Sequence, residues 1–334
     1  ITSINNSGTV SINRPDRIIT EDDVRRVVET AQAIQIPPES EVIHIIPRQY
    51  IVDGQDGITD PIGMTGTRLE VDVHIVTGAI TAVHNLVRCV ESLGIGIRQI
   101  VLEPIASSLA VLSSAEKELG VILMDIGGGT TDISVFRGGD IWFSKVIPIA
   151  GEHITNDITV GLQTPIEEAE LIKKQHGTAL VDSVGEEEKI EVATIGGDEK
   201  KLVSKKKLAK IIEPRVEELL DLAMQEVEDA GYRDLVPAGL VLTGGTSLLN
   251  GITEFAAQRY DLPVRRGKIP QGIHGLRDIV ESPIYATAIG LLRYAIETKD
   301  FKKPEYADRR RGGGSAGGSI VGKLVAWFNR FFRG

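Results

Sequence analysis

The sequence has 334 residues and a formal net charge of −10, and this length favours two or more subdomains over a single core. An apolar fraction of 42% indicates a globular protein, whereas an aromatic fraction of 4% and the negative charge disfavour nucleic acid as a partner. Cys89 is the only cysteine, which excludes a disulfide framework and a thiolate zinc site and fits a reducing compartment.

Residues 1–77 alternate between helix and strand patterns, as expected of an α/β subdomain. Thr20 and the acidic residues 21–23 form a capping signal before the helical stretch VRRVVETAQAI. The strand EVIHIIPRQYIV follows, and its Pro47 predicts either an edge position or a bend. A turn-rich stretch, DGQDGITDPIGMTG, then leads into the alternating strand TRLEVDVHIVTG.

Residues 78–118 predict a helix, a strand and a second helix. The apolar face expected of the first helix consists of Ala82, Leu86, Val87, Val90 and Leu93. Cys89 lies beside that face, so we interpret it as a packing residue. The strand is IRQIVLEP, and the second helix, ASSLAVLSS, is rich in small residues.

The stretch VILMDIGGGTTDISVFRGGDIWFSKVIPIAG, residues 121–151, begins as a buried strand and then breaks into three glycines and two threonines. Glycines allow successive backbone N–H groups to close around phosphate oxygens, and threonine hydroxyls add further donors. A carboxylate at the strand end can hold a hydrated divalent cation. The candidate ligands are Asp125, Gly127, Gly128, Gly129, Thr130 and Thr131. The alternative is a plain glycine-rich hairpin with a tight turn at Gly138–Gly139.

A second buried strand, AGLVLTGGTSLLNGI, ends in Gly244 and Gly245, followed by Thr246 and Ser247 and then a helix. Paired glycines ahead of a helix N-terminus suit a ribose and phosphate site. Neither a G-x-x-x-x-G-K-[ST] loop nor a G-x-G-x-x-G loop after a first strand occurs. Two glycine loops that flank an insertion therefore predict a nucleotide cleft of another kind.

The block 163–234 is more polar than its surroundings. It contains an acidic cluster, Glu186–Glu188, and a basic cluster, Lys205–Lys207, which we interpret as solvated hairpin or helix faces. The six histidines of the chain show no spacing typical of metal ligands.

The tail is basic, in contrast to the acidic body. Residues 297–319 include GGGSAGG and predict a flexible linker.

The last stretch, IVGKLVAWFNRFFRG, separates into an apolar and a cationic side on a helical wheel. It is too short to span a bilayer but suits a helix in the headgroup plane, with docking on the body or on a partner protein as the alternative. The predicted membrane contacts are Leu324, Val325, Trp327, Phe328, Phe331 and Phe332, with Lys323, Arg330 and Arg333 facing anionic lipids. One such tail binds weakly, and several tails on one assembly bind firmly through avidity.

These motifs resemble those of the actin, Hsp70 and hexokinase superfamily of ATP-binding proteins. DIGGGTTD is similar to its second phosphate loop and LTGGTSLL to its adenosine loop, while VLEPIASSLAVL is similar to its connecting helix and EEAELIKKQHG to a segment beside the nucleoside. More narrowly, IPRQYIVDGQDGITDPIGMTGTRLEVDVHIVTG resembles the 1C subdomain that the FtsA family of bacterial cell-division proteins carries in place of the 1B subdomain of actin.

The resemblance implies an α/β fold of the actin-like, ribonuclease H-like kind, with two α/β halves, and ATP with Mg²⁺ as ligands. In that superfamily the position of Glu103 orients the water that attacks the γ-phosphate, so any ATPase activity, at most slow, is assigned to it. Glu170 and Lys173 are placed near the nucleoside, and Asp125 holds Mg²⁺ through water. Thr246 stands where many members of the superfamily have a third glycine or an alanine.

The resemblance also implies a division into subdomains. The expected parts are 1C (1–77), the remainder of 1A (78–118), 2A (119–162 and 235–296), 2B (163–234), a flexible linker (297–319) and an amphipathic membrane-targeting helix (320–334). The family's first phosphate loop does not occur in the printed sequence, so we expect either a fragment or a one-sided cleft.

The implied function is that of a cell-division adaptor that polymerises and tethers FtsZ filaments to the cytoplasmic face of the cell membrane at the division site. The C-terminal peptide of FtsZ is expected on 2B and other division proteins on 1C. Two alternatives stay open at this point: an actin-like protein of pilus assembly, and an ATP-hydrolysing, chaperone-like member of the superfamily.

Overall fold

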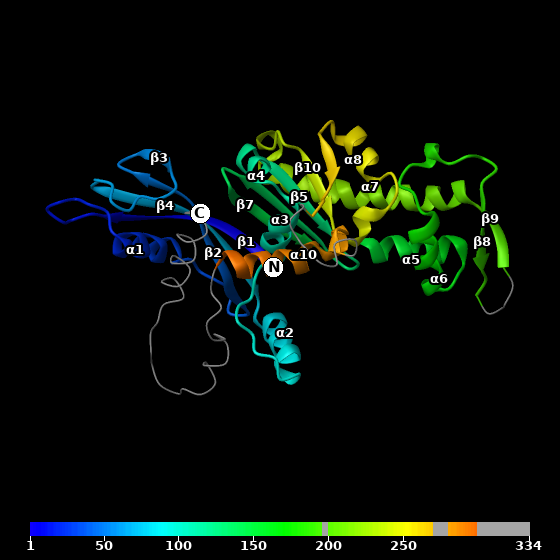
Figure 1. The fold of residues 1–334 in the computed structure, drawn as a ribbon, viewed down its shortest axis with the longest axis horizontal. Helices are drawn as coiled ribbons and strands as arrows, with labels where there is room; N and C mark the ends of the chain where they lie inside the picture. The colour runs from blue at the N-terminus through cyan, green and yellow to red at the C-terminus, as the bar shows by residue number, and fades with distance from the viewer. Residues whose placement is uncertain (196–199, 270–279, 299–334) are drawn as a thin grey trace. The chain divides into compact units, whose positions relative to one another are not determined.

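The structure, a computed structural model, describes residues 1–195, 200–269 and 280–298 (Figure 1). The chain divides into two compact units. Of the described residues, one unit comprises 1–105 and 291–298, and the other comprises those within 106–290. Helices α3 (Glu103–Val111) and α10 (Ala286–Glu297) each carry the chain from one unit into the other.

The first unit is built on a four-stranded antiparallel sheet with the order β1-β4-β2-β3. Its strands are β1 (Thr2–Ser11), β2 (Ser40–Val52), β3 (Gln55–Ile58) and β4 (Arg68–Ala79). Alternate residues of β4, among them Val71, Val73 and Ile75, are fully buried in one core cluster with residues of α1. This alternation is the one predicted from the sequence, because successive side chains of a strand point to opposite faces.

Helix α1 (Glu21–Ala31) begins where the capping signal places it, since the Thr20 N–H donates to the Asp23 carboxylate at 3.0 Å. The helix buries Val24, Val27 and Val28 against the sheet. Its approach to β1 is so close that a Cβ on Gly8 would lie 2.4 Å from the Val27 carbonyl oxygen. Glycine at that position is therefore a packing requirement.

In the sheet order β2 lies between β4 and β3, but β3 pairs only with Tyr50 and Val52, so among the described strands Pro47 is paired on one side only, to β4. The bend is present as well, because the register of β2 against β4 shifts between Pro47 and Gln49. A bulge accommodates a residue that has no N–H to donate to the ladder. A second register shift lies between Val42 and His44.

Three expectations for residues 78–105 are wrong. Helix α2 (Ile80–Ser92) is present, but it buries Val83 and Val87, whereas Leu86 and Leu93 of the expected face are exposed. Cys89 is exposed rather than packed. Residues 95–102 form no strand, and α3 begins directly at Glu103.

The second unit contains a five-stranded mixed sheet with the order β11-β10-β5-β6-β7. Its strands are β5 (Val121–Ile126), β6 (Thr131–Arg137), β7 (Asp140–Ile147), β10 (Leu240–Thr243) and β11 (Val264–Arg266). All residues of β5 are buried, and β6 and β7 follow it as antiparallel neighbours, as the sequence predicts. Gly138 and Gly139 form the tight turn at φ values of 58° and 86°. Strand β10 pairs parallel to β5, so the ends of both strands lie at the same edge of the sheet.

The helices of this unit are α4 (Ser114–Leu119), α5 (Gly151–Leu162), α6 (Ile166–His176), α7 (Lys205–Asp229) and α8 (Ile252–Tyr260). Helices α5 and α7 contact each other, and the apolar side of α7 joins the main core cluster. Strands β8 (Lys189–Ala193) and β9 (Lys200–Ser204) form a separate hairpin. The charge clusters of this region lie at the surface, where Glu186 pairs with Lys206, and Glu188 with Lys205 at 2.9 Å.

The predicted linker from residue 299 onward and the amphipathic helix 320–334 lie outside the described residues. Within residues 1–195, 200–269 and 280–298, no helix combines the length and the apolar character needed to cross a membrane. The finer division into subdomains stays a prediction.

Candidate functional site

The loop after β5 is closed by a hydrogen bond from Gly127 N–H to the Thr130 carbonyl at 3.0 Å. Its carbonyls face the start of α5, where Gly151 N–H donates to Gly127 at 3.1 Å and Glu152 N–H to Gly128 at 2.8 Å. Residues 128–130 are exposed. The carbonyl side of the loop is thus engaged by the protein, and the rest of the loop faces solvent as an anion site requires.

The loop after β10 packs directly on the end of β5. Gly244 has φ of 81°, and a Cβ there would lie 2.5 Å from Asp125 Oδ1 and 2.5 Å from the Ile126 carbonyl oxygen. Thr246 Oγ1 donates to the Gly127 carbonyl at 2.8 Å. The two glycine loops that the sequence analysis singles out therefore meet in the folded chain.

Two of the predicted hydroxyl donors point into the protein. Thr131 Oγ1 donates to the Ile149 carbonyl at 2.7 Å, and Ser247 Oγ donates to the Gly244 carbonyl at 2.7 Å. Both side chains are fully buried. They shape the two loops in this structure, whereas Thr130 and Gly245 are exposed.

Asp125 is buried at the strand end, and Thr287 Oγ1 donates to its Oδ2 at 3.5 Å. Among the described residues, no group of three or more histidine, cysteine or acidic side chains is arranged to hold a metal ion directly. A single carboxylate suits a cation that keeps most of its water shell, as Mg²⁺ does beside phosphates.

Lys173 and Glu170 lie on α6 and contact the first turn of α5, which adjoins the two glycine loops. Lys173 Nζ lies 2.6 Å from Glu170 Oε2, 2.9 Å from the Gly151 carbonyl oxygen and 2.8 Å from Thr155 Oγ1. Burial alone would raise the pKa of Glu170, but hydrogen bonds from Lys173 and Thr155 outweigh it and lower the pKa. Glu170 is therefore a carboxylate at neutral pH, and it fixes the ammonium beside the α5 N-terminus.

The sequence analysis missed Gly151 and Thr155. A Cβ on Gly151 would lie 2.3 Å from Thr246 Oγ1 and 3.5 Å from Lys173 Nζ, so both loops and the ion pair converge on this glycine. Thr155 Oγ1 bonds to Glu170 Oε2 at 2.5 Å. The signal in the sequence is the stretch PIAGEHIT, in which a glycine follows a strand and a threonine stands one helical turn later.

Glu103 is exposed in the first turn of α3. It belongs to the unit of residues 1–105, whereas both glycine loops belong to the unit of residues 106–290. The role of Glu103 beside the nucleotide stays a prediction.

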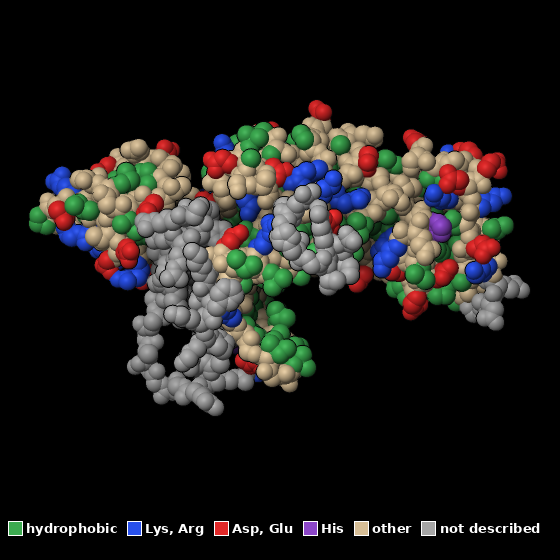
Figure 2. Space-filling view, in the orientation of Figure 1, with side chains coloured by type: hydrophobic (Ala, Val, Ile, Leu, Met, Phe, Trp, Pro, Cys, Tyr) green, Lys and Arg blue, Asp and Glu red, His purple; other side chains and the backbone are tan. Residues whose placement is uncertain are grey.

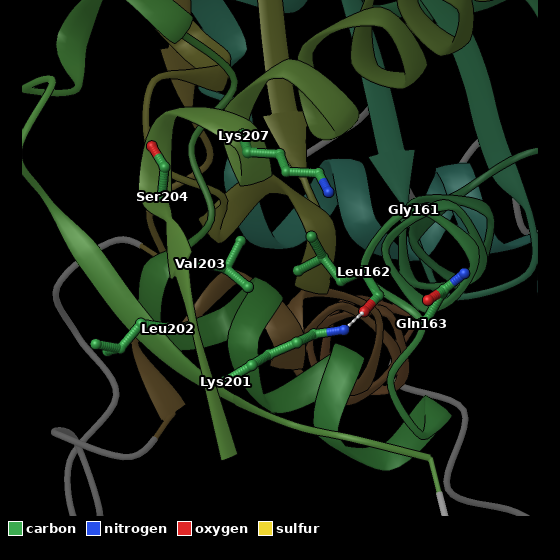
Figure 3. Close-up of a pocket in the computed structure, with 8 residues that line it drawn as sticks. All are labelled: Gly161, Leu162, Gln163, Lys201, Leu202, Val203, Ser204 and Lys207. Atoms are coloured by element: carbon green, nitrogen blue, oxygen red, sulfur yellow. Dashed lines mark hydrogen bonds between the residues drawn. The ribbon is translucent and has the colours of Figure 1, made fainter. Parts of the chain in front are cut away.

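A hollow of about 450 Å³ lies between the end of α5, strand β9 and the start of α7 (Figure 3). Lys201 Nζ donates to the Leu162 carbonyl at 2.6 Å, which caps the C-terminal end of α5, and Lys207 of α7 adds a second ammonium. Val203 and Leu162 supply the apolar lining, whereas the Leu202 side chain points away from it (Figure 3). In Figure 2, acidic and basic side chains are interspersed over the region of α6, β8 and β9. The hollow thus offers local positive charge on a mixed surface.

Two family models match the chain. The model described as "Cell division protein FtsA" matches residues 122–290, and the model described as "SHS2 domain inserted in FTSA" matches residues 1–77.

Curated relatives match over most of the chain. The cell division protein FtsA of Pseudomonas aeruginosa is 45% identical over 297 residues, which cover 89% of this chain and 70% of the relative. The cell division protein FtsA of Neisseria meningitidis serogroup B is 44% identical over 335 residues, which cover 99% of this chain and 80% of the relative.

Solved structures match at lower identity. A PilM-PilN type IV pilus biogenesis complex matches with a TM-score of 0.56 at 19% identity, covering 87% of this chain and 76% of the other. MreB5 of Spiroplasma citri bound to ADP matches with a TM-score of 0.53 at 20% identity, covering 65% of each chain, which is less than two thirds of MreB5. These likenesses establish the fold, which is α/β and actin-like, as expected.

Proposed function

Because this chain belongs to the FtsA family of cell-division proteins, we propose that it is an ATP-binding adaptor that polymerises and tethers FtsZ filaments to the cell membrane. The observation that carries the nucleotide part is the hydrogen bond of Thr246 to Gly127, because it brings two bare glycine loops and a helix N-terminus to one point. Membership of the family favours cell division over the pilus-assembly and chaperone-like alternatives.

In the proposed site, backbone groups of Gly128, Gly129 and Gly244–Gly245 approach the phosphates and ribose, with Thr130 as a hydroxyl donor. Gly127, whose N–H donates to Thr130 and whose carbonyl accepts from Gly151 and Thr246, holds the loop in shape. Asp125 holds Mg²⁺ through water, and the pair of Lys173 and Glu170 lies beside the nucleoside. The solved structure of MreB5 of Spiroplasma citri is bound to ADP, which supports nucleotide binding in this fold. ATP acts as a ligand that changes the conformation of the protein. Glu103 orients the attacking water for a slow hydrolysis of ATP.

Three surfaces are assigned to partners. The hollow beside Lys207 is proposed as the seat of the C-terminal peptide of FtsZ, since its ammonium groups suit the terminal carboxylate of a peptide and its apolar lining suits apolar side chains. Residues 1–77 are proposed to bind other division proteins. Residues 320–334 are proposed to lie on anionic lipid at the cytoplasmic face of the membrane.

Co-sedimentation with vesicles tests the whole proposal. Vesicles of phosphatidylglycerol and phosphatidylethanolamine are mixed with this chain, Mg·ATP and FtsZ filaments, and FtsZ is assayed in the pellet. We expect FtsZ in the pellet only when the chain is present and FtsZ keeps its C-terminal peptide. Equal recovery of FtsZ that lacks the peptide would contradict the tether.

A further inference from the structure

His44 lies in β2 at the register shift that follows Val42. Val42 pairs with Thr77, His44 with Val76, and Ile45 with Ile75. Ile45 and Ile75 face the core cluster shared with α1, so the bulge turns His44 to the opposite face of the sheet. In a regular strand His44 would share the face of Val42, two residues earlier.

On that face the His44 ring binds the segment that leads into α3. Nε2 accepts the Leu102 N–H at 3.0 Å, and the two residues are 58 positions apart. Both side chains are buried, at 1% and 3% exposure. Leu102 directly precedes Glu103, so this bond holds the backbone at the point where α3 begins.

The protonation state of the His44 ring allows Nε2 to act as a hydrogen-bond acceptor. Burial lowers the pKa of His44 to about 4, so the ring is neutral at physiological pH. Because Nε2 accepts, the proton resides on Nδ1. Within the described part of the chain, Nδ1 has no hydrogen-bond partner and is buried. An unpaired buried donor is costly, and residues other than histidine would fill this space without that cost.

We propose that His44 is a positioning residue for Glu103: its bond to Leu102 ties the carboxylate at the start of α3 to strand β2. The proposal rests on the role proposed above for Glu103, and it deepens that role. A protein that binds the sheet of residues 1–77 and shifts β2 would thereby move Glu103 and change the rate of ATP hydrolysis.

A matched pair of substitutions distinguishes the effect of losing the hydrogen-bond acceptor from the effect of losing the volume of the ring. Glutamine and methionine have unbranched side chains of similar length, but only glutamine carries a strong acceptor. His44→Gln and His44→Met are compared with His74→Met, which removes the other buried histidine of the same sheet, bonded through Nδ1 to Asn5 at 2.7 Å. Glu103→Gln serves as the reference for loss of the carboxylate.

Hydrogen exchange of the Leu102 amide, measured without nucleotide, is the first readout. We expect exchange about tenfold faster in His44→Met than in wild type, near wild type in His44→Gln, and unchanged in His74→Met after correction for global stability. Equal exchange in the two His44 variants would overturn the proposal. This comparison needs no ATP turnover, so it tests the hydrogen bond between His44 and Leu102 even in a chain that does not hydrolyse ATP.

The second readout is ATP hydrolysis. His44→Met is expected to lower kcat several-fold at unchanged KM, in the same direction as Glu103→Gln, and His44→Gln is expected to restore it. Faster exchange with unchanged kcat would overturn the link from His44 to Glu103. Wild-type turnover in Glu103→Gln would instead contradict the role proposed for Glu103 itself.

Discussion

The hydroxyl of Thr246 donates to the carbonyl oxygen of Gly127 at 2.8 Å, although the two residues are 119 positions apart in the chain. Gly127 also accepts the N–H of Gly151, so one carbonyl joins the second glycine loop to the start of α5. Hydrogen bonds within the protein therefore hold the two glycine loops to each other. For the proposed nucleotide site, such preorganisation would lower the cost of binding.

Removal of the Thr246 hydroxyl is expected to weaken ATP binding. Thr246→Val keeps the shape of the side chain but loses the donor, and one hydrogen bond of about 1 kcal/mol corresponds to roughly fivefold in affinity. Thr246→Ser keeps the donor and is the control. Calorimetric titration with Mg·ATP checks the prediction, which fails if valine and serine bind ATP equally well.

Gly244 is expected to tolerate no side chain. Gly244→Ala places a methyl group 2.5 Å from Asp125 Oδ1 and also imposes a positive φ on alanine. Strain of about 1–3 kcal/mol should appear as a lower free energy of unfolding, together with a loss of ATP affinity. For the free energy of unfolding, Gly245→Ala is the matched control, since the nearest heavy atom to its Cβ is Ile284 Cγ1 at 4.0 Å. An equal loss of unfolding free energy in the two variants would contradict the prediction.

Glu116 is expected to stabilise the fold in a pH-dependent way. Burial would raise the pKa of this carboxyl, but hydrogen bonds from Arg265 and Ser113 outweigh it and lower the pKa to about 2. Because the pKa in the folded protein lies below the usual value of 4.5 for glutamate, the stabilisation is complete above pH 4.5 and is lost as pH falls toward 2.

The measurement is urea unfolding of Glu116→Gln and wild type at several pH values. The variant should be less stable by about 1 kcal/mol at pH 7, because the pair is partly exposed, and the gap should close toward pH 2. Glu118→Gln removes a charge from the same helix, α4, without touching Arg265. A gap that stays constant with pH would refute the assignment.

Lys207 is expected to contribute to the binding of the FtsZ C-terminal peptide. Lys207→Glu reverses a charge that lines the hollow and should weaken binding of the peptide about tenfold at low salt. The effect should be smaller at high salt, because salt screens exposed charges. Lys189→Glu reverses an exposed charge on β8 outside the hollow. Fluorescence anisotropy with labelled peptide distinguishes the two, and an equal loss in both would show only a nonspecific effect of charge.

Trp327 is expected to be necessary for membrane attachment. Trp327→Glu puts a charge on the apolar side of the predicted helix and should abolish vesicle binding while the body stays folded. Asn329→Glu adds the same charge on the cationic side and should reduce binding only modestly. Vesicle flotation checks both, and attachment of Trp327→Glu at the wild-type level would rule out the predicted helix as the anchor.

Local signals predicted local structure well. The capping signal at Thr20 marks the start of α1, and the turn at Gly138–Gly139 has the positive φ values that its glycines permit. The apolar run 121–126 is the buried strand β5. In each case the interactions that decide the conformation lie within a few residues of one another.

Where burial depends on packing against another element, the sequence predicted less. Apolar residues occur on more than one side of α2, so the pattern alone could not choose between Leu86 and Val83, and contact with β4 selects Val83. The stretch 97–104, IRQIVLEP, forms no strand, and its last two residues begin α3. A strand also requires an edge to pair with, which a local pattern does not supply.

The sequence by itself determined the composition of the two glycine loops, the family resemblance that they carry, and the elements on either side of them. Only the tertiary structure decided that Gly127, Gly151 and Thr246 meet, and that His44 reaches Leu102. The physical reason is that these contacts depend on the parallel pairing of β10 with β5 and on a bulge in β2. Strand order and register are properties of the whole sheet, and no local pattern of residues specifies them.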